Sequence, residues 1–141
     1  MFSRQGTEST QDITLPYGVF PTRNFREGVL PNWENIEGAA YDRIRTRNVT
    51  CYSCMVHCGS INKINFGKYA GWWTEGPEYE TIWGFTGPIV CSEIGLTVAA
   101  DRECDRLGLD TISTASTIGF AYECYERGLI SKEEAGGLEL R

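Results

Sequence analysis

The sequence of 141 residues has little of what directs a protein to nucleic acid, to a membrane or out of the cell. It has 13 lysines and arginines against 19 aspartates and glutamates, a net charge of −6, and no stretch in which basic residues gather. Because nucleic-acid affinity depends largely on neutralising phosphates with cations, we expect no nucleic-acid partner. No apolar run approaches the roughly 20 residues that span a bilayer, and residues 1–12 lack the apolar centre of a signal peptide. We therefore expect a cytoplasmic protein with no membrane partner.

The composition that is present predicts a folded body with one core. Hydrophobic residues make up 41% of the chain and charged residues 23%, which is typical of globular proteins. Proline and glycine at positions 16, 18, 21, 28 and 31 interrupt any regular period, so residues 1–35 are expected to form an irregular lead-in arm. Residues 36–141 would then form the domain itself.

Hydrophobic periodicity and capping residues predict a mainly α fold with little strand. The predicted helices are a short one over 36–47, one over 96–107 that ends at Gly108, one from Asp110 to Gly128, and the start of another at Ser131, where Glu134 completes a capping box. Short alternating runs broken by glycine over residues 60–80 favour a hairpin. A chain with an uncapped arm at one end and a barely started helix at the other looks like a segment of a longer protein.

The six cysteines are the strongest chemical signal, because three of them lie together in CYSCMVHCG. Cys51, Cys54 and Cys58 have the order C-x2-C-x3-C, which lets three thiolates fold back toward one iron–sulfur cluster or zinc ion. Structural zinc usually takes a second C-x2-C pair, which this chain lacks, so iron–sulfur ligation is favoured. The spacing is the reverse of that in radical enzymes that use S-adenosylmethionine. The simpler alternative is three small buried hydrophobic residues.

Three further stretches accompany the cysteines: PTRNF at 21–25, EGPEYETIW at 75–83 and DRLGLDTIST at 105–114. In this order and at these separations, the four motifs resemble those of the tungsten-dependent aldehyde ferredoxin oxidoreductase family. The resemblance runs from about residue 15 to the last residue. It implies a mainly α domain, the first helical domain of a considerably longer enzyme, which would supply the remaining domains as partners of this one.

The resemblance also implies cofactors and the residues that hold them. Cys51, Cys54 and Cys58 would ligate a [4Fe–4S] cluster, with a fourth cysteine from a domain outside this sequence. A tungsten bis-pterin, held mostly by absent domains, would meet residues of the DRLGLD stretch, for which the candidates are Asp105, Gly108, Leu109 and Asp110. The local sequence alone favours the simpler interpretation, a helix–turn–helix in which Asp110 is an ordinary cap.

Catalysis would involve a glutamate of EGPEYE near the tungsten. We favour Glu80, with Glu75 and Glu78 behind it, because a buried carboxylate there would have a raised pKa and could move protons to or from the substrate. Without the resemblance, three glutamates in a loop of glycine and proline would be read as solvated. The only histidine, His57, lies in the cysteine loop and does not supply the family's catalytic histidine.

The sequence therefore predicts part of an enzyme that oxidises aldehydes to carboxylic acids and passes electrons to ferredoxin or an electron-transfer subunit. An alternative within the same class is the catalytic subunit of a tungsten-dependent reductase of aromatic acyl-CoA substrates such as benzoyl-CoA. From other classes, the chain could be a non-catalytic iron–sulfur or zinc-binding module, or a purely structural domain. This segment alone is expected to be inactive.

Overall fold

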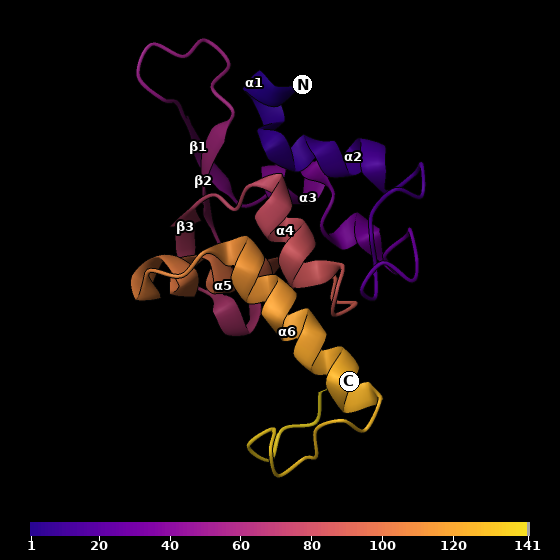
Figure 1. Cartoon of the computed structure of the whole chain (residues 1–141). Helices are drawn as coiled ribbons and strands as arrows, with labels where there is room; N and C mark the ends of the chain where they lie inside the picture. The colour runs from indigo at the N-terminus through magenta and orange to yellow at the C-terminus, as the bar shows by residue number, and fades with distance from the viewer. Residues whose placement is uncertain (141) are drawn as a thin grey trace.

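The computed structural model describes residues 1–140 of the chain (Figure 1). The elements in chain order are α1 (Phe2–Gln5), η1 (Thr7–Thr10), α2 (Gln11–Thr14), η2 (Trp33–Asn35), α3 (Gly38–Asp42), β1 (Arg45–Val49), β2 (Gly59–Lys63), η3 (Gly67–Tyr69), β3 (Trp73–Glu75), α4 (Tyr79–Thr86), α5 (Ile94–Leu107) and α6 (Thr111–Glu126). Helices α4, α5 and α6 are the longest elements, and the strands are short. The prediction of a mainly α fold with little strand is confirmed.

The two long helices at the C-terminal end form where their sequence signals place them. Helix α5 ends at Gly108, whose left-handed conformation (φ 69°, ψ 33°) turns the chain. Helix α6 begins after Asp110, whose carboxylate accepts a hydrogen bond from the Ser113 amide at 2.7 Å. The apolar residues Val98 and Cys104 on one side of α5 are buried, as helical spacing requires.

The predicted helix over 36–47 is only partly present. Helix α3 ends at Asp42, and β1 begins at Arg45. The Ile44 carbonyl accepts a hydrogen bond from the Lys63 amide at 2.9 Å, so the chain pairs with β2 instead of continuing its own helical ladder. Pairing with a distant strand overrides local helical spacing here.

The predicted hairpin is present, as the pairing of β2 with β3. The sheet has the order β1-β2-β3 and both pairs are antiparallel. Because β1 and β2 are adjacent in this sheet, residues 50–58, which carry the three clustered cysteines, form the connection between two paired strands. We call residues 50–58 the thiol loop.

No helix follows Ser131 within the described residues, although its predicted capping box forms. The Ser131 amide donates to Glu134 Oε2 at 2.8 Å, and the Glu134 amide donates to Ser131 Oγ at 3.2 Å. Only turns follow. Gly136 and Gly137 have φ of 67° and 84°, which a right-handed helix cannot accommodate.

The N-terminal arm is less irregular than predicted, because residues 2–14 form three consecutive helical turns. Its apolar side chains reach the core: Leu15, Phe20 and Leu30 pack in one cluster with Ile82 of α4 and Val98 of α5, and each is at most 1% exposed. The arm and the helices therefore share one hydrophobic core.

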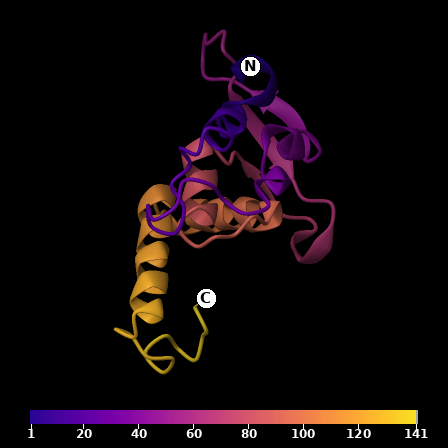
Figure 2. The ribbon, with the colours of Figure 1, turned by 90° about the vertical axis from the view of Figure 1, so that its right-hand side faces the viewer.

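Helix α6 runs away from this core, and the C-terminal turns lie at its far end (Figure 2). The thiol loop is at the opposite end of the molecule, beside α1 (Figure 1). Among residues 1–140, no helix combines the length and the apolar character needed to cross a membrane.

Candidate functional site

The thiol loop is shaped by its own hydrogen bonds. The Thr50 hydroxyl donates to the carbonyls of Cys51 and Cys54, at 3.2 and 2.9 Å, and the Cys54 amide donates to the Cys51 carbonyl at 3.1 Å. Ser53 and His57 have positive φ, 56° and 55°, which tightens the loop. These hydrogen bonds and positive φ angles turn the chain back on itself between Cys51 and Cys58.

The loop is not packed as core. Cys51 is exposed, Cys54 and Cys58 are half-buried, and the Tyr52 and Met55 side chains between them are 100% and 90% exposed. The alternative of three small buried hydrophobic residues is therefore wrong. Of the six cysteines, Cys104 of α5 is buried in the core.

The three clustered cysteines line a single open pocket of about 420 Å³, which we call the thiol pocket. Its lining residues are Val49, Thr50, Cys51, Cys54, Cys58, Gly59, Glu75, Glu78 and Asp105. They come from the thiol loop with its flanking strands, from the end of β3 and the segment before α4, and from the C-terminal turn of α5. Six residues predicted from the sequence to belong to a site thus lie around one pocket.

Four other predicted site residues do not line this pocket. Glu80 lies in the first turn of α4 and is exposed. Gly108, Leu109 and Asp110 form the exposed turn between α5 and α6, in which the Leu109 amide donates to the Cys104 carbonyl at 2.9 Å. The turn begins three residues after Asp105, which does line the pocket.

The environment of Cys54 favours the thiolate over the thiol. Hydrogen bonds from the backbone amides of Val56 and His57 lower the pKa of Cys54, and the Thr50 hydroxyl adds to the effect. Among residues 1–140, no three Cys, His, Asp or Glu side chains are gathered closely enough to hold a single metal ion. A four-iron cluster takes one thiolate on each of its irons, so its ligands surround a larger body. The exposed loop, the thiolate-favouring amides and the open pocket fit such a group.

The buried carboxylate that we expected in the glutamate stretch lies elsewhere, on α5. Asp101 is 7% exposed, and its Oδ2 accepts a hydrogen bond from the buried Thr74 hydroxyl at 2.6 Å. Burial is the main cause that raises the pKa of Asp101 to about 6; the negative charges of Asp105 and Glu78 add to this net shift, and the Thr74 hydrogen bond opposes it. Its spacing from Val98 and Cys104, three residues on either side, was the sequence signal that α5 buries this position.

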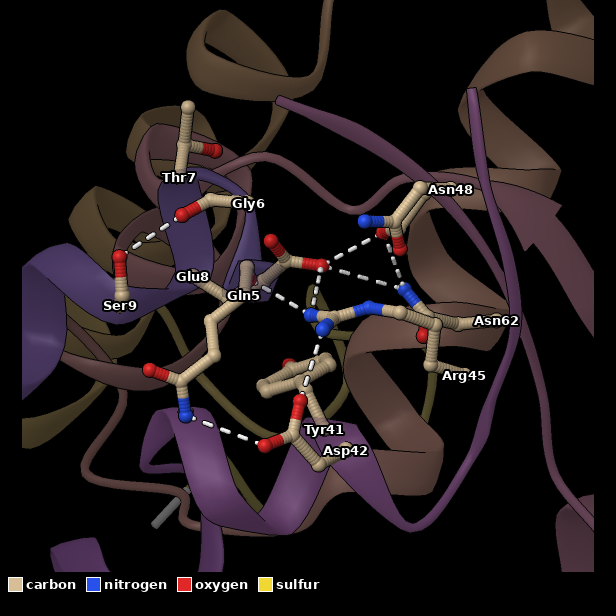
Figure 3. A network of polar contacts seen from close by, with 12 residues as sticks. Gln5, Gly6, Thr7, Glu8, Ser9, Tyr41, Asp42, Arg45, Asn48 and Asn62 are labelled. Carbon is tan, nitrogen blue, oxygen red and sulfur yellow. Dashed lines mark hydrogen bonds and ion pairs between the residues drawn. The ribbon is translucent and has the colours of Figure 1, made fainter. Parts of the chain in front are cut away.

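A second buried carboxylate, Glu8 of η1, lies beside Arg45 of β1 and Asn62 of β2, the two strands that flank the thiol loop (Figure 3). Its Oε1 accepts hydrogen bonds from Ser60 Oγ at 2.6 Å and from Asn62 Nδ2 at 3.3 Å, and lies 3.4 Å from the Arg45 guanidinium. Burial raises the pKa of Glu8, against the opposing effects of Ser60, Arg45 and Asn62. The sequence offered no signal for this residue, because η1 is too short to show a period.

Comparison with known proteins identifies relatives of this chain. The family model described as "Aldehyde ferredoxin oxidoreductase, domains 2 & 3" matches residues 1–141. The chain is 37% identical over 135 residues to the tungsten-containing aldehyde ferredoxin oxidoreductases of Thermococcus kodakarensis and Pyrococcus furiosus, a match that covers 94% of this chain and 22% of each relative. It is 32% identical over 120 residues to the aliphatic sulfonate oxidoreductase, WOR-like subunit, of Pyrococcus furiosus, covering 82% of this chain and 19% of that protein. The chain thus spans about a fifth of the length of these curated relatives.

Proposed function

The chain belongs to the aldehyde ferredoxin oxidoreductase family, and from this premise we propose that it forms the cluster-binding and pterin-facing part of a tungsten-dependent oxidoreductase. The reaction converts an aldehyde and water into a carboxylic acid, two protons and two electrons, and ferredoxin accepts the electrons one at a time. The observation that carries the proposal is the shared pocket of Cys51, Cys54 and Cys58 with Glu75, Glu78 and Asp105.

The three cysteines would hold a [4Fe–4S] cluster at the thiol pocket, with a fourth ligand from another part of the same polypeptide. When bound, the cluster supplies one-electron transfer and a tungsten bis-pterin supplies the two-electron oxidation. The amides of Val56 and His57, which lower the pKa of Cys54, would hold one cluster ligand as thiolate. Hydrogen bonds to a ligating sulfur also help to set the reduction potential of a cluster.

The carboxylates of the pocket would accept the protons that the reaction releases. Glu75 and Glu78 lie on the wall that faces the thiols, which places them better than Glu80 to accept the protons that oxidation releases. Asp105 lines the same pocket, and Gly108, Leu109 and Asp110 follow it in an exposed turn. This turn would present acceptors to the N–H groups of a pterin. Glu80, exposed at the start of α4, would act only on a substrate that approaches from outside the pocket.

The proposal is tested on the full-length enzyme purified without oxygen. We expect about four irons per protein, a broad iron–sulfur absorption band and an EPR signal on reduction. Cys51→Ser, Cys54→Ser and Cys58→Ser should each lose most of the signal. Cys91→Ser, a half-buried cysteine outside the thiol loop, should keep it. Colourless protein that contains zinc would contradict the proposal.

Substrate choice is tested by supplying aldehydes and benzoyl-CoA in parallel. We expect electron transfer to ferredoxin with aldehydes, because the relatives with 35–37% identity are named aldehyde ferredoxin oxidoreductases. Reduction of benzoyl-CoA by reduced ferredoxin, with no oxidation of aldehydes, would move the protein to the aromatic acyl-CoA reductases. Glu75→Gln and Glu78→Gln should lower kcat with little effect on the iron signal, because glutamine removes the charge but keeps the side-chain shape and, at position 78, an oxygen that can accept the Thr7 hydrogen bond. Glu80→Gln should lower kcat less.

A further inference from the structure

Three consecutive residues of the N-terminal arm, Gly6, Thr7 and Glu8, lie against the thiol pocket. Gly6 approaches its thiol wall (Cys51, Cys54 and Cys58), and Thr7 contacts its glutamate wall (Glu75 and Glu78). Glu8 contacts the strands that flank the thiol loop. The three residues stand at the junction of α1 and η1, in the segment where the sequence predicts only an irregular arm. Gly6 and Glu8 are buried and Thr7 is half-buried. Each of the three makes a different contact, and each contact reaches a different part of the site.

Gly6 lies against the end of the thiol loop. A β-carbon at this position would stand 2.8 Å from the Cys58 carbonyl oxygen, closer than real β-carbons approach, and would also meet the Glu8 carboxylate. Gly6 has a φ of 72°, which disfavours other residues independently of the space. Its carbonyl accepts a hydrogen bond from the buried Ser9 hydroxyl at 2.8 Å, so its position is fixed. Only glycine at position 6 therefore allows the arm to approach the Cys58 backbone this closely.

Thr7 contacts the opposite wall. Its hydroxyl donates a hydrogen bond to the Glu78 carboxylate and accepts one from the Tyr79 amide at 3.1 Å. Glu78 is the N-cap residue of α4 and lines the thiol pocket. One hydroxyl thus fixes both the direction of the Glu78 side chain and the start of the helix behind it.

Glu8 joins the two strands that carry the thiol loop. Arg45 is the first residue of β1, and Ser60 and Asn62 belong to β2, so the Glu8 carboxylate bridges the base of the loop (Figure 3). The Arg45 guanidinium also donates to the carbonyls of Arg4 and Gln5, at 2.8 and 2.6 Å. The polar groups of the arm and of the sheet are therefore paired mainly with each other.

The same network continues to the glutamate wall. The Asn62 side-chain amide donates to the Gly76 carbonyl at 2.6 Å, and the Gly76 amide donates to the Ser60 carbonyl at 2.8 Å. Gly76 lies between Glu75 and Glu78, both of which line the pocket. The two walls are thus connected twice: through Thr7, and through Glu8 by way of Asn62.

We propose that Gly6, Thr7 and Glu8 form a clamp that holds Glu78 at a fixed position relative to Cys58, and that all three are positioning residues for the metal group of the thiol pocket. The inference rests on the proposed function, since it assigns these residues to the same site. Residues that orient metal ligands without touching the metal typically change metal affinity or activity by about 10- to 100-fold when they are replaced.

The test uses the full-length holoenzyme, purified without oxygen, with the substitutions Thr7→Val and Glu8→Gln. Valine keeps the shape of Thr7 but removes its hydroxyl, and glutamine keeps the shape of Glu8 but removes its charge. We expect iron loss to the chelator bathophenanthroline disulfonate to become about 10-fold faster or more in each variant. The cluster's midpoint potential and EPR line shape should shift in both variants. Thr7→Ser, which restores the hydroxyl, should behave as wild type.

The matched control is Thr10→Val. Thr10 lies in the same 3-10 helix and is half-buried like Thr7, but its hydroxyl makes no hydrogen bond with any of residues 1–140. The clamp is overturned if Thr7→Val and Glu8→Gln show the same rate of iron loss and the same EPR spectrum as Thr10→Val. It is also overturned if Thr7→Ser does not restore the wild-type rate and spectrum. Should Glu8→Gln not fold, the Thr7 series alone decides.

The outcomes also separate the clamp from the function on which it rests. A wild-type holoenzyme that carries the cluster and loses it in Cys51→Ser sustains the proposed function, even if both clamp variants behave as the control does. A wild-type enzyme without iron overturns both.

Discussion

Two buried carboxylates stand behind the two walls of the thiol pocket, Glu8 beside the strands that flank the thiol loop and Asp101 behind the glutamate wall. Glu8 has a cation, because Arg45 lies 3.4 Å from its Oε1 and is itself 9% exposed. Asp101 has none: within the described residues it forms no ion pair, and the neighbouring Arg102 stacks over the Trp73 ring at 4.6 Å. Its charged neighbours are Asp105 and Glu78, both acidic.

The difference indicates different uses for the two walls. A cation and two hydrogen-bond donors stabilise a buried carboxylate in one position and in its ionised form. A buried carboxylate whose pKa is about 6 and whose neighbours are acidic changes protonation near neutral pH. We infer that Glu8 holds the thiol wall in one fixed geometry, and that the glutamate wall tolerates a change in the charge of Asp101.

The largest expected effect comes from removing the cation on the thiol wall. Arg45→Met leaves Glu8 buried without its partner, and breaking a buried ion pair in this way costs about 3–5 kcal/mol. We expect a loss of this size in the free energy of unfolding, measured by denaturant titration of the full-length protein. Glu8→Gln in the same chain should recover part of it, because a neutral amide needs no cation.

The control for this prediction is Arg47→Met, on the same strand. Arg47 is exposed and forms no ion pair within residues 1–140. Its replacement should leave the stability nearly unchanged. An Arg45→Met protein as stable as the control would show that the two walls do not differ in the way described.

The opposite sign is expected on the glutamate wall, where Asp101→Asn should stabilise the protein at neutral pH. The folded state raises the pKa of Asp101 from 3.8 to about 6, so it holds a proton that the unfolded chain releases. Its contribution is fully present below about pH 4 and is lost as the pH rises through about 6. The loss is at most about 3 kcal/mol. Asparagine can still accept the Thr74 hydrogen bond and has no such dependence.

The measurement is hydrogen exchange of the β3 and α5 amides, converted to a local opening free energy, between pH 4 and 8. Wild type should lose protection as the pH rises, and Asp101→Asn should not. Glu103→Gln on the same helix is the control: Arg106 lowers the pKa of Glu103 below its usual 4.5, so its contribution changes only at lower pH and its profile between about pH 5 and 8 should match that of wild type. Parallel wild-type and Asp101→Asn profiles would contradict the assignment.

A smaller effect is expected at the turn that follows Asp105. Gly108→Ala places a β-carbon at φ 69° with no atom within 4 Å, so its cost is backbone strain alone, about 1–2 kcal/mol. Gly128→Ala is a matched control, because Gly128 has the same φ of 69° and the same open surroundings at the far end of α6. Both should lower stability equally. Only Gly108→Ala should change the iron signal, because Gly108 is three residues from Asp105 of the thiol pocket, whereas Gly128 follows the far end of α6.

The glutamate side of the pocket was easier to predict from the sequence than the base of the thiol loop. Helices α5 and α6 follow from spacing and from caps at Gly108 and Asp110, which are local signals. The cysteine spacing and the glutamate stretch pointed to residues that do line one pocket. Local chemistry was sufficient wherever the determining residues are neighbours in sequence.

The base of the loop depends on contacts between distant segments. Residues 45–47 of β1 were predicted to be helical, because local spacing does not show that this segment pairs with β2 further along the chain. Glu8 lies in the arm, and its partner Ser60 is 52 residues further along the chain. Nothing near Glu8 in sequence distinguishes a buried carboxylate from an exposed one. Such residues become visible only when the fold brings their partners together.

The smallest expected effect is at Asp110, which caps α6 on the exposed side of the same turn. Its carboxylate accepts the Ser113 amide at 2.7 Å, and this bond lowers the pKa of Asp110. The cap is therefore present above about pH 4, the range of the unfolded carboxyl, and is lost as the pH falls through the lower folded value. Asp110→Ala should speed exchange of the Ser113 amide at pH 7 while leaving the iron signal unchanged, and Asp110→Asn should restore protection because it keeps an acceptor. If Asp110→Ala instead altered the iron signal as strongly as Gly108→Ala, the turn would act on the pocket as one rigid unit and the cap would belong to the site.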